Sequence, residues 1–373
     1  MILSKTIETF YKNLLKPIFF KRDPEDVHDR MLRVGTALGN TSVTRRITRL
    51  VFNFDDPKLT QKVDGLVYRN PVGLSAGFDK DANLLKIIHE VGFSFSEIGS
   101  VTLHPYEGNP RPRLYRLKKD RGLVVFYGLK NIGVDKIIEK IKKNYTSSKG
   151  NILGISIART NSQEASGFIE GINDYTKSLQ KLVDADIGDY YTINISCPNT
   201  FYGEPYSTPE RLNKLLISLK KTKTTKPIYL KMPINLDWGI FENLLDVAVD
   251  YKINGVIIGN LNKDRNSKYI TESYPEDIKG GVSGIPTREL SNELIKRTYR
   301  KYKDKLTIIG VGGIDSAQSA YEKICYGASL VQLITGMIFN GPQLIGQINK
   351  ELVMLLEKDG YKNINEAIGS KVQ

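Results

Sequence analysis

Short apolar runs alternate with helix-length amphipathic segments along most of this chain, and this alternation limits the possible folds more than any other feature. Each run has the length of a buried strand, and the segments between runs repeat apolar residues every three or four positions, as helices do. Strands that alternate with helices build a parallel sheet. The predicted strands are Val72–Leu74, Phe95–Ile98, Ile152–Ile157, Tyr190–Ile195, Ile228–Lys231, Gly255–Ile258, Leu306–Gly310 and Leu330–Leu333.

Eight strand–helix units predict a (β/α)₈ TIM barrel, and we assign residues 56–373 to it. A doubly wound sheet is the alternative. Such sheets usually have fewer strands, and no Gly-x-Gly-x-x-Gly follows the first run here. An Asp64-Gly65 turn between two short apolar runs also predicts a β-hairpin ahead of the barrel. The predicted helices include Ile169–Leu182, Glu210–Lys221, Glu289–Tyr302 and Ala317–Tyr326.

Residues 1–55 are interpreted as a separate helical extension made of two short helices. Phe10, Leu14 and Ile18 recur on one face of the first helix, and Asp23 is a natural N-cap for the second. The first fifty residues hold ten Lys/Arg against five Asp/Glu, so this is the more basic part of the chain. A basic hairpin with an apolar face either caps a core or lies on an anionic bilayer.

The composition excludes several classes of protein. With 40% hydrophobic and 25% charged residues, the chain is neither disordered nor built for the bilayer interior. Two cysteines cannot form a disulfide framework, so we expect a reducing compartment. We interpret Cys325 as a buried core residue without a functional role. The longest uncharged stretch, 326–349, contains several glycines and a proline and is not expected to span a membrane.

Polar residues follow the ends of the predicted strands, where functional side chains of such barrels lie. Lys80 comes soon after the first strand, Cys197 lies between two asparagines after the fourth, and Lys231 ends the fifth. Glycine-rich turns at 310–313 and 335–336 follow the last two strands, where barrels commonly bind phosphate through backbone N–H groups. Their joint placement predicts a phosphate-bearing cofactor and a small, planar, anionic substrate.

Five longer motifs are spread over nearly the whole chain, namely Asn70–Lys80, Gly108–Leu117, Asn194–Asn199, Gly280–Gly284 and Ile308–Asp315. Together they resemble the motifs of dihydroorotate dehydrogenases. The N-terminal hairpin, with Asp23-Pro24-Glu25 and His28, is similar to that of the membrane-associated, quinone-using class. The resemblance implies bound FMN, oxidation of (S)-dihydroorotate to orotate in pyrimidine biosynthesis, and reoxidation of the flavin by a membrane quinone.

The same resemblance implies roles for individual residues. Cys197 would be the catalytic base, and His28 and Arg116 would lie at the quinone site; no metal is expected. The residues implied for the substrate are Lys80, Asn194, Asn199, Asn260, Val125 and Leu129. Those implied for FMN are Ala76, Gly77, Lys80, Ser100, Ser156, Asn194, Lys231, Gly259, Gly284, Gly312, Gly313, Ile334 and Thr335.

The chain departs from the family pattern at several of these positions. Cys197 replaces the serine of the quinone class; a thiol loses its proton more easily than a hydroxyl, especially beside lysines. Val125 stands where an asparagine usually meets the substrate, and Leu129 also differs. Ser156 and Ile334 replace an asparagine and a tyrosine beside the flavin. The flavin site therefore resembles the family more closely than the substrate site does.

These departures leave two other functions open. One is an FMN enzyme acting on another dihydropyrimidine, such as a dihydrouridine synthase reducing tRNA, which the net charge of +13 could favour. Only about twenty residues follow the last barrel helix, however, so we expect no RNA-binding domain and no nucleic-acid partner. The other is a catalytically silent membrane-bound flavoprotein.

The hairpin begins almost at Met1, which leaves no room for a transit peptide. We therefore expect a peripheral position on the cytoplasmic side of a bacterial membrane, held through the N-terminal helices on an anionic surface.

Overall fold

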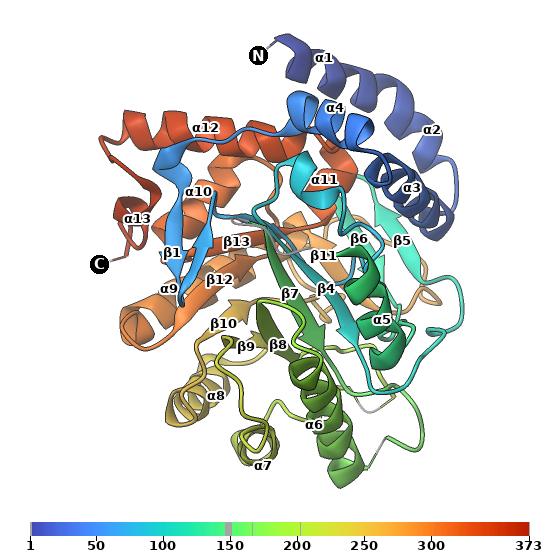
Figure 1. The fold of residues 1–373 in the computed structure, drawn as a ribbon, viewed down its shortest axis with the longest axis vertical. Coiled ribbons are helices and arrows are strands. Elements are labelled where there is room, and N and C mark those ends of the chain that lie inside the picture. The colour runs from blue at the N-terminus through green and yellow to red at the C-terminus, as the bar shows by residue number, and fades with distance from the viewer. Residues whose placement is uncertain (1, 146–150, 166, 202, 373) are drawn as a thin grey trace.

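A closed barrel of eight parallel strands forms the centre of the molecule (Figure 1). The computed structural model describes residues 2–145, 151–165, 167–201 and 203–372. Going around the barrel, the strand order is β10-β12-β13-β3-β4-β7-β8-β9. The eight predicted strands and the (β/α)₈ prediction are confirmed. The strands are β3 (Val72–Leu74), β4 (Phe95–Val101), β7 (Ile152–Ile157), β8 (Tyr190–Asn194), β9 (Ile228–Met232), β10 (Gly255–Ile258), β12 (Thr307–Val311) and β13 (Leu330–Leu333).

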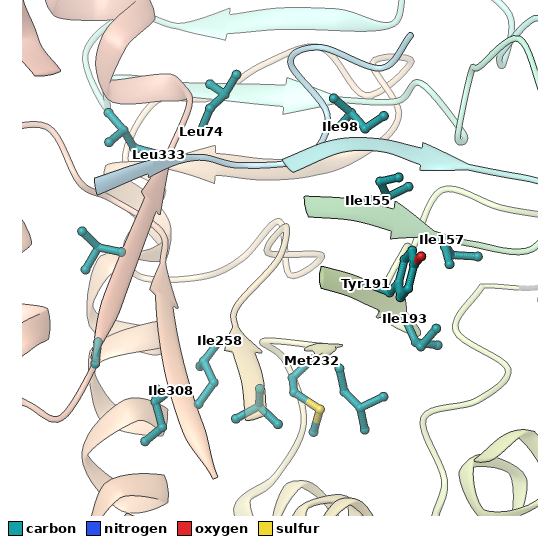
Figure 2. Packing of buried hydrophobic residues seen from close by; sticks show 14 of the residues in the cluster. Leu74, Ile98, Ile155, Ile157, Tyr191, Ile193, Met232, Ile258, Ile308 and Leu333 are labelled. Carbon is teal, nitrogen blue, oxygen red and sulfur yellow. The ribbon is translucent and has the colours of Figure 1, made fainter. Parts of the chain in front are cut away.

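Helices surround the barrel and bury one face of every strand (Figure 1). Leu74, Ile155 and Met232 belong to the large apolar cluster that strands and helices share (Figure 2). Successive strand side chains alternate between this cluster and the barrel interior. The helices are α5 (Val134–Asn144), α6 (Phe168–Asp184), α7 (Pro209–Leu219), α8 (Trp238–Asp250), α9 (Arg288–Tyr302), α10 (Ala317–Cys325), α11 (Thr335–Asn340), α12 (Leu344–Lys358) and α13 (Ile364–Ala367). Short 3₁₀ turns occur at Pro57–Leu59, Ile88–Val91 and Ile285–Thr287.

Aromatic side chains close the N-terminal end of the barrel. Phe95, Tyr190 and Tyr229, near the starts of their strands, form a second apolar cluster with the hairpin of β1 (Gln61–Val63) and β2 (Leu66–Tyr68). The two residues between β1 and β2 have positive φ, as the predicted turn requires. Only the opposite end of the barrel is left for a pocket.

A polar layer lies above this aromatic plug. The buried Glu97 carboxylate accepts hydrogen bonds from Thr192 Oγ1 (2.9 Å) and Gln332 Nε2 (3.2 Å). The next inward positions along β8 and β9 are Asn194 and Lys231, which are paired in register. The barrel interior thus changes from apolar to polar toward its C-terminal end.

A second, three-stranded antiparallel sheet lies beside the barrel and was not predicted from the sequence. It consists of β5 (Leu114–Leu117), β6 (Gly122–Val125) and β11 (Gly281–Gly284), in the order β11-β6-β5. Each strand has only four residues, and β11 is distant from the other two in the chain. Such short strands lack an alternation that sequence reasoning could detect.

The N-terminal extension contains more helices than the predicted hairpin. It runs through α1 (Ile2–Phe10), a π-helical turn (Tyr11–Leu15) and α2 (Lys16–Phe20), then α3 (Pro24–Gly39) and α4 (Ser42–Phe52). The predicted cap of α3 is present, since the Asp23 carboxylate accepts the Glu25 N–H at 2.8 Å.

Helix α4 was missed, although Thr41 caps it and Val43, Ile47 and Leu50 recur at helical spacing; its apolar face is exposed and not part of the core. Ile47 and Leu50 on this helix are 55% and 76% exposed. In Figure 1 the extension lies along one side of the molecule, next to α11, α12 and the small sheet. Among the described residues, no helix combines the length and the apolar character needed to cross a membrane.

Candidate active site

A deep pocket opens at the C-terminal end of the barrel. It encloses about 1260 Å³, including open space at its mouth. The strand ends form its floor and one wall, while β6 and β11 of the small sheet contribute the other wall through Leu123, Val125 and Ser283. Its size allows a tricyclic cofactor and a small substrate to lie side by side.

Most residues singled out in the sequence line this pocket. Ser156 does not, because its Oγ lies 2.8 Å behind Ser100 Oγ and reaches the pocket only through that hydroxyl. Arg116 also lies outside the lining. The predicted residues that line the pocket are His28, Ala76, Gly77, Lys80, Ser100, Val125, Leu129, Asn194, Cys197, Asn199, Lys231, Gly259, Asn260, Gly284, Gly312, Gly313, Ile334 and Thr335.

Lys231 is a buried cation at the floor of the pocket. Its Nζ donates to Ser75 Oγ at 3.2 Å, and within the described part of the chain it has no carboxylate at ion-pair distance. Burial lowers the pKa of Lys231, while the Glu97 carboxylate below it acts in the opposite direction. Beside it, Asn194 Nδ2 donates to Ser100 Oγ at 2.8 Å. A bound group that carries negative charge would give Lys231 the partner it lacks.

The loop after β8 holds Cys197 between two amide side chains. Asn199 Nδ2 donates to the Val125 carbonyl at 2.8 Å, and Asn260 Nδ2 donates to the Ser196 carbonyl at 2.9 Å. Burial raises the pKa of the Cys197 thiol to about 11, although a backbone hydrogen bond of Asn199 lowers it. The expectation that neighbouring lysines favour the thiolate is therefore outweighed by desolvation.

Lys80 connects the barrel to the N-terminal extension. Its Nζ lies 3.4 Å from His28 Nε2 and 3.9 Å from the centre of the Tyr127 ring. Burial lowers the pKa of Lys80 to about 8. Burial and the charge on Lys80 also place the pKa of His28 well below its usual value, so the imidazole is neutral and accepts from the ammonium.

A glycine-rich turn borders the pocket after β12. Gly312 and Gly313 have φ of 108° and 70°, a region that residues with a Cβ rarely adopt. Arg288 holds this turn from behind, because its Nε donates to the Gly313 carbonyl at 2.8 Å and its Nη2 lies 2.6 Å from Asp315 Oδ1. Exposed backbone without side chains is what a phosphate cradle needs.

Ionic contacts join the extension to the barrel beside the pocket. Glu25, in the first turn of α3, is 1% exposed and lies 3.0 Å from Arg113 and 3.2 Å from Arg111. Arg116, on β5, donates to the Arg22 carbonyl at 2.7 Å. These contacts bring α2 and α3 against the small sheet.

Tyr127, Leu261 and Ser283 are among the pocket residues that were not predicted. Tyr127 stacks on Lys80, Leu261 follows Asn260, and Ser283 Oγ lies 2.9 Å from Thr335 Oγ1. Ser283 and Tyr127 enter from the small sheet and the loop after it, which sequence periodicity did not reveal. Leu261 could have been found from its place directly after the sixth barrel strand's polar residue.

Comparison with known proteins agrees with this architecture. The family model described as "Dihydroorotate dehydrogenase" matches residues 58–356. A protein of Nostoc punctiforme called dihydroorotate dehydrogenase (quinone) is 35% identical over 97% of this chain and 98% of its own length. One of Christiangramia forsetii with the same name is 36% identical, covering 92% of this chain and 98% of itself.

Among solved structures, the DHODH of Eimeria tenella in complex with ferulenol superimposes with a TM-score of 0.83 and 26% identity. This match covers 93% of our chain and 95% of that one. Both the family model and the relatives extend over most of the sequence, so the chain belongs to the dihydroorotate dehydrogenase family.

Proposed function

We propose that this protein oxidises dihydroorotate to orotate, with FMN as the hydride acceptor and a membrane quinone as the terminal acceptor. The observation that carries the proposal is the pocket itself. A buried lysine, three asparagines and a cysteine face one another there, next to a glycine-rich turn. The proposed reaction needs no nucleic acid.

The residues present fit FMN. Gly312 and Gly313, with Thr335, would hold the phosphate, and Lys231 is a buried cation suited to the charge that a flavin gains on reduction. When bound, FMN supplies the hydride acceptor. Ser100 and Asn194 would fix its position through the hydrogen-bonded pair that they form.

Asn199 and Asn260 would bind the amide edges of the pyrimidine, and Lys80 would bind its carboxylate. Cys197 Sγ would then remove the proton from C5 of the substrate while C6 loses its hydride. Since burial raises the pKa of Cys197 to about 11, this proton transfer becomes faster as the pH rises. Cys197 must face the substrate on the side away from the flavin.

One observation favours a second candidate, an oxidoreductase for a related dihydropyrimidine. Val125, Leu129 and Leu261 give the pocket an apolar wall beside Asn199 and Asn260. A substrate with fewer polar edges than dihydroorotate would suit this wall better, because a buried polar group without a partner costs about 1–3 kcal/mol.

The N-terminal helices would dock on an anionic membrane surface and admit the quinone. Their exposed apolar side chains lie next to exposed arginines such as Arg46 and Arg49, the combination that binds anionic lipid. Arg116 and the neutral His28 would bind the quinone between these helices and the pocket. The apolar residues are Phe10, Leu14, Ile18, Val34, Leu38, Val43, Ile47 and Leu50, which are more than half of the exposed large hydrophobic residues in the described structure.

Two measurements test the proposal. Orotate formation with a long-chain quinone should occur in the full chain, and a screen of other dihydropyrimidines should give slower turnover. Vesicles of anionic lipid should bind the protein, and the double substitution of Ile47 and Leu50 by Glu should abolish that binding. The matched control replaces Ile169 and Ile217, which are exposed on α6 and α7, by Glu. Equal loss in both variants would contradict docking through α4.

A further inference from the structure

A buried lysine lies behind the glycine-rich turn and takes no part in the chemistry described above. Lys323, on α10, has no exposed surface. Its Nζ donates to Asn292 Oδ1 at 2.8 Å and to Ser291 Oγ, both on α9. Across the described residues, no carboxylate lies within ion-pair distance of it. A buried ammonium that has only neutral partners is unusual, because burying an unpaired charge is costly.

Lys323 is connected to the turn by direct packing. A Cβ built on Gly310 would lie 3.3 Å from Lys323 Cδ, and one built on Gly312 would lie 3.2 Å from Ser291 Oγ. Ser291, which accepts from Lys323, donates in turn to the Arg288 carbonyl at 3.2 Å. The ammonium is therefore one side chain away from the backbone that faces the pocket, although Lys323 does not line the pocket itself.

We infer that Lys323 is a positioning residue that supplies buried positive charge behind the phosphate cradle, so that a phosphate ester bound at Gly312 and Gly313 compensates this charge from a distance, without contact. This inference rests on the proposed FMN site. The preference for a phosphorylated flavin would then depend on a residue that does not touch the ligand.

The charges around Lys323 determine how this compensation depends on pH. Arg288 on α9 disfavours the ammonium, while Glu322 on α10 and Glu289 on α9 favour it. Asp315 is already paired with Arg288 at 2.6 Å. Burial dominates and lowers the pKa of Lys323 to about 7, so the side chain is mostly neutral at pH 8. A phosphate dianion nearby raises that pKa, and its binding must therefore take up a proton.

Riboflavin, which lacks the phosphate, provides the discriminating probe. Protein stripped of flavin should bind FMN at pH 8 with uptake of protons, measured by calorimetry in buffers of different ionisation enthalpy, and should bind riboflavin without uptake. In Lys323→Met, FMN should bind about tenfold more weakly, as expected for a charge lost at intermediate dielectric. Proton uptake should disappear, and riboflavin affinity should stay within about twofold. Lys296→Met, which removes a charge from the outer side of α9, is the matched control and should change neither quantity.

If Lys323→Met weakens FMN and riboflavin equally, the lysine is structural and the inference is wrong. If the wild-type protein binds FMN without proton uptake, the inference is also wrong, and this result does not depend on the variant folding. If neither flavin binds the wild-type protein, the proposed function fails instead.

Discussion

Replacing Glu25 by Gln tests how the N-terminal extension is attached to the barrel. The Glu25 carboxylate lies 3.0 Å from Arg113, and the two side chains are 2% and 12% exposed. Removing one partner of a buried ion pair costs about 3–5 kcal/mol, because the other charge is left unpaired. Arg111 is half-exposed, so its contact adds little. Gln keeps the shape of the side chain, and we therefore expect a loss of about 3 kcal/mol in the free energy of unfolding.

Urea denaturation measures this loss, and Asp26→Asn is the matched control. Asp26 neighbours Glu25 and also contacts Arg111, but its side chain is 63% exposed, so its loss should cost less than about 1 kcal/mol. Glu25→Gln should also slow electron transfer to quinone more than reduction of the flavin, because α3 is loosened while the barrel is intact. Equal stability of the two variants would refute this reasoning.

Three further predictions concern the pocket. Flavin reduction by dihydroorotate should accelerate about tenfold per pH unit below the raised pKa of Cys197. The Cys197→Ser substitution should move this rise in rate to higher pH. If the pH profile of the variant is the same as that of the wild type, Cys197 is not the base. Lys231→Met should slow flavin reduction about 10²–10³-fold and lower the flavin reduction potential in a redox titration, whereas an unchanged potential would contradict the role of Lys231. Val125→Asn should lower the KM for dihydroorotate about fivefold, the equivalent of one hydrogen bond, and a KM that stays the same would show that this wall does not meet the substrate.

The barrel was predictable because its strands are short, mostly apolar runs between polar turns. Ile152–Ile157 and Gly255–Ile258 were located to the residue, since both strands are buried and bounded by clear breaks. The hairpin at Asp64-Gly65 was predictable for a different reason, namely that its turn demands residues that tolerate positive φ.

The parts that could not be predicted depend on contacts between distant segments. The small sheet pairs Val125 with Gly281, and no local sequence pattern indicates that strand register. The pocket residues were identified from strand ends and from resemblance. The contacts between their side chains and the resulting pKa shifts were not predicted. Neither the contact of Lys80 with His28 nor the raised pKa of Cys197 follows from sequence, because both depend on how deeply the folded protein buries these groups.

The most direct test of the proposed activity is a single turnover without oxygen. The purified flavin-loaded protein is mixed with dihydroorotate, and the visible absorbance of the flavin is followed in time. We predict rapid bleaching, with one orotate formed per flavin, and recovery of the absorbance when quinone is added. A flavin that stays oxidised in the presence of saturating dihydroorotate would contradict the assignment of this pocket to dihydroorotate oxidation.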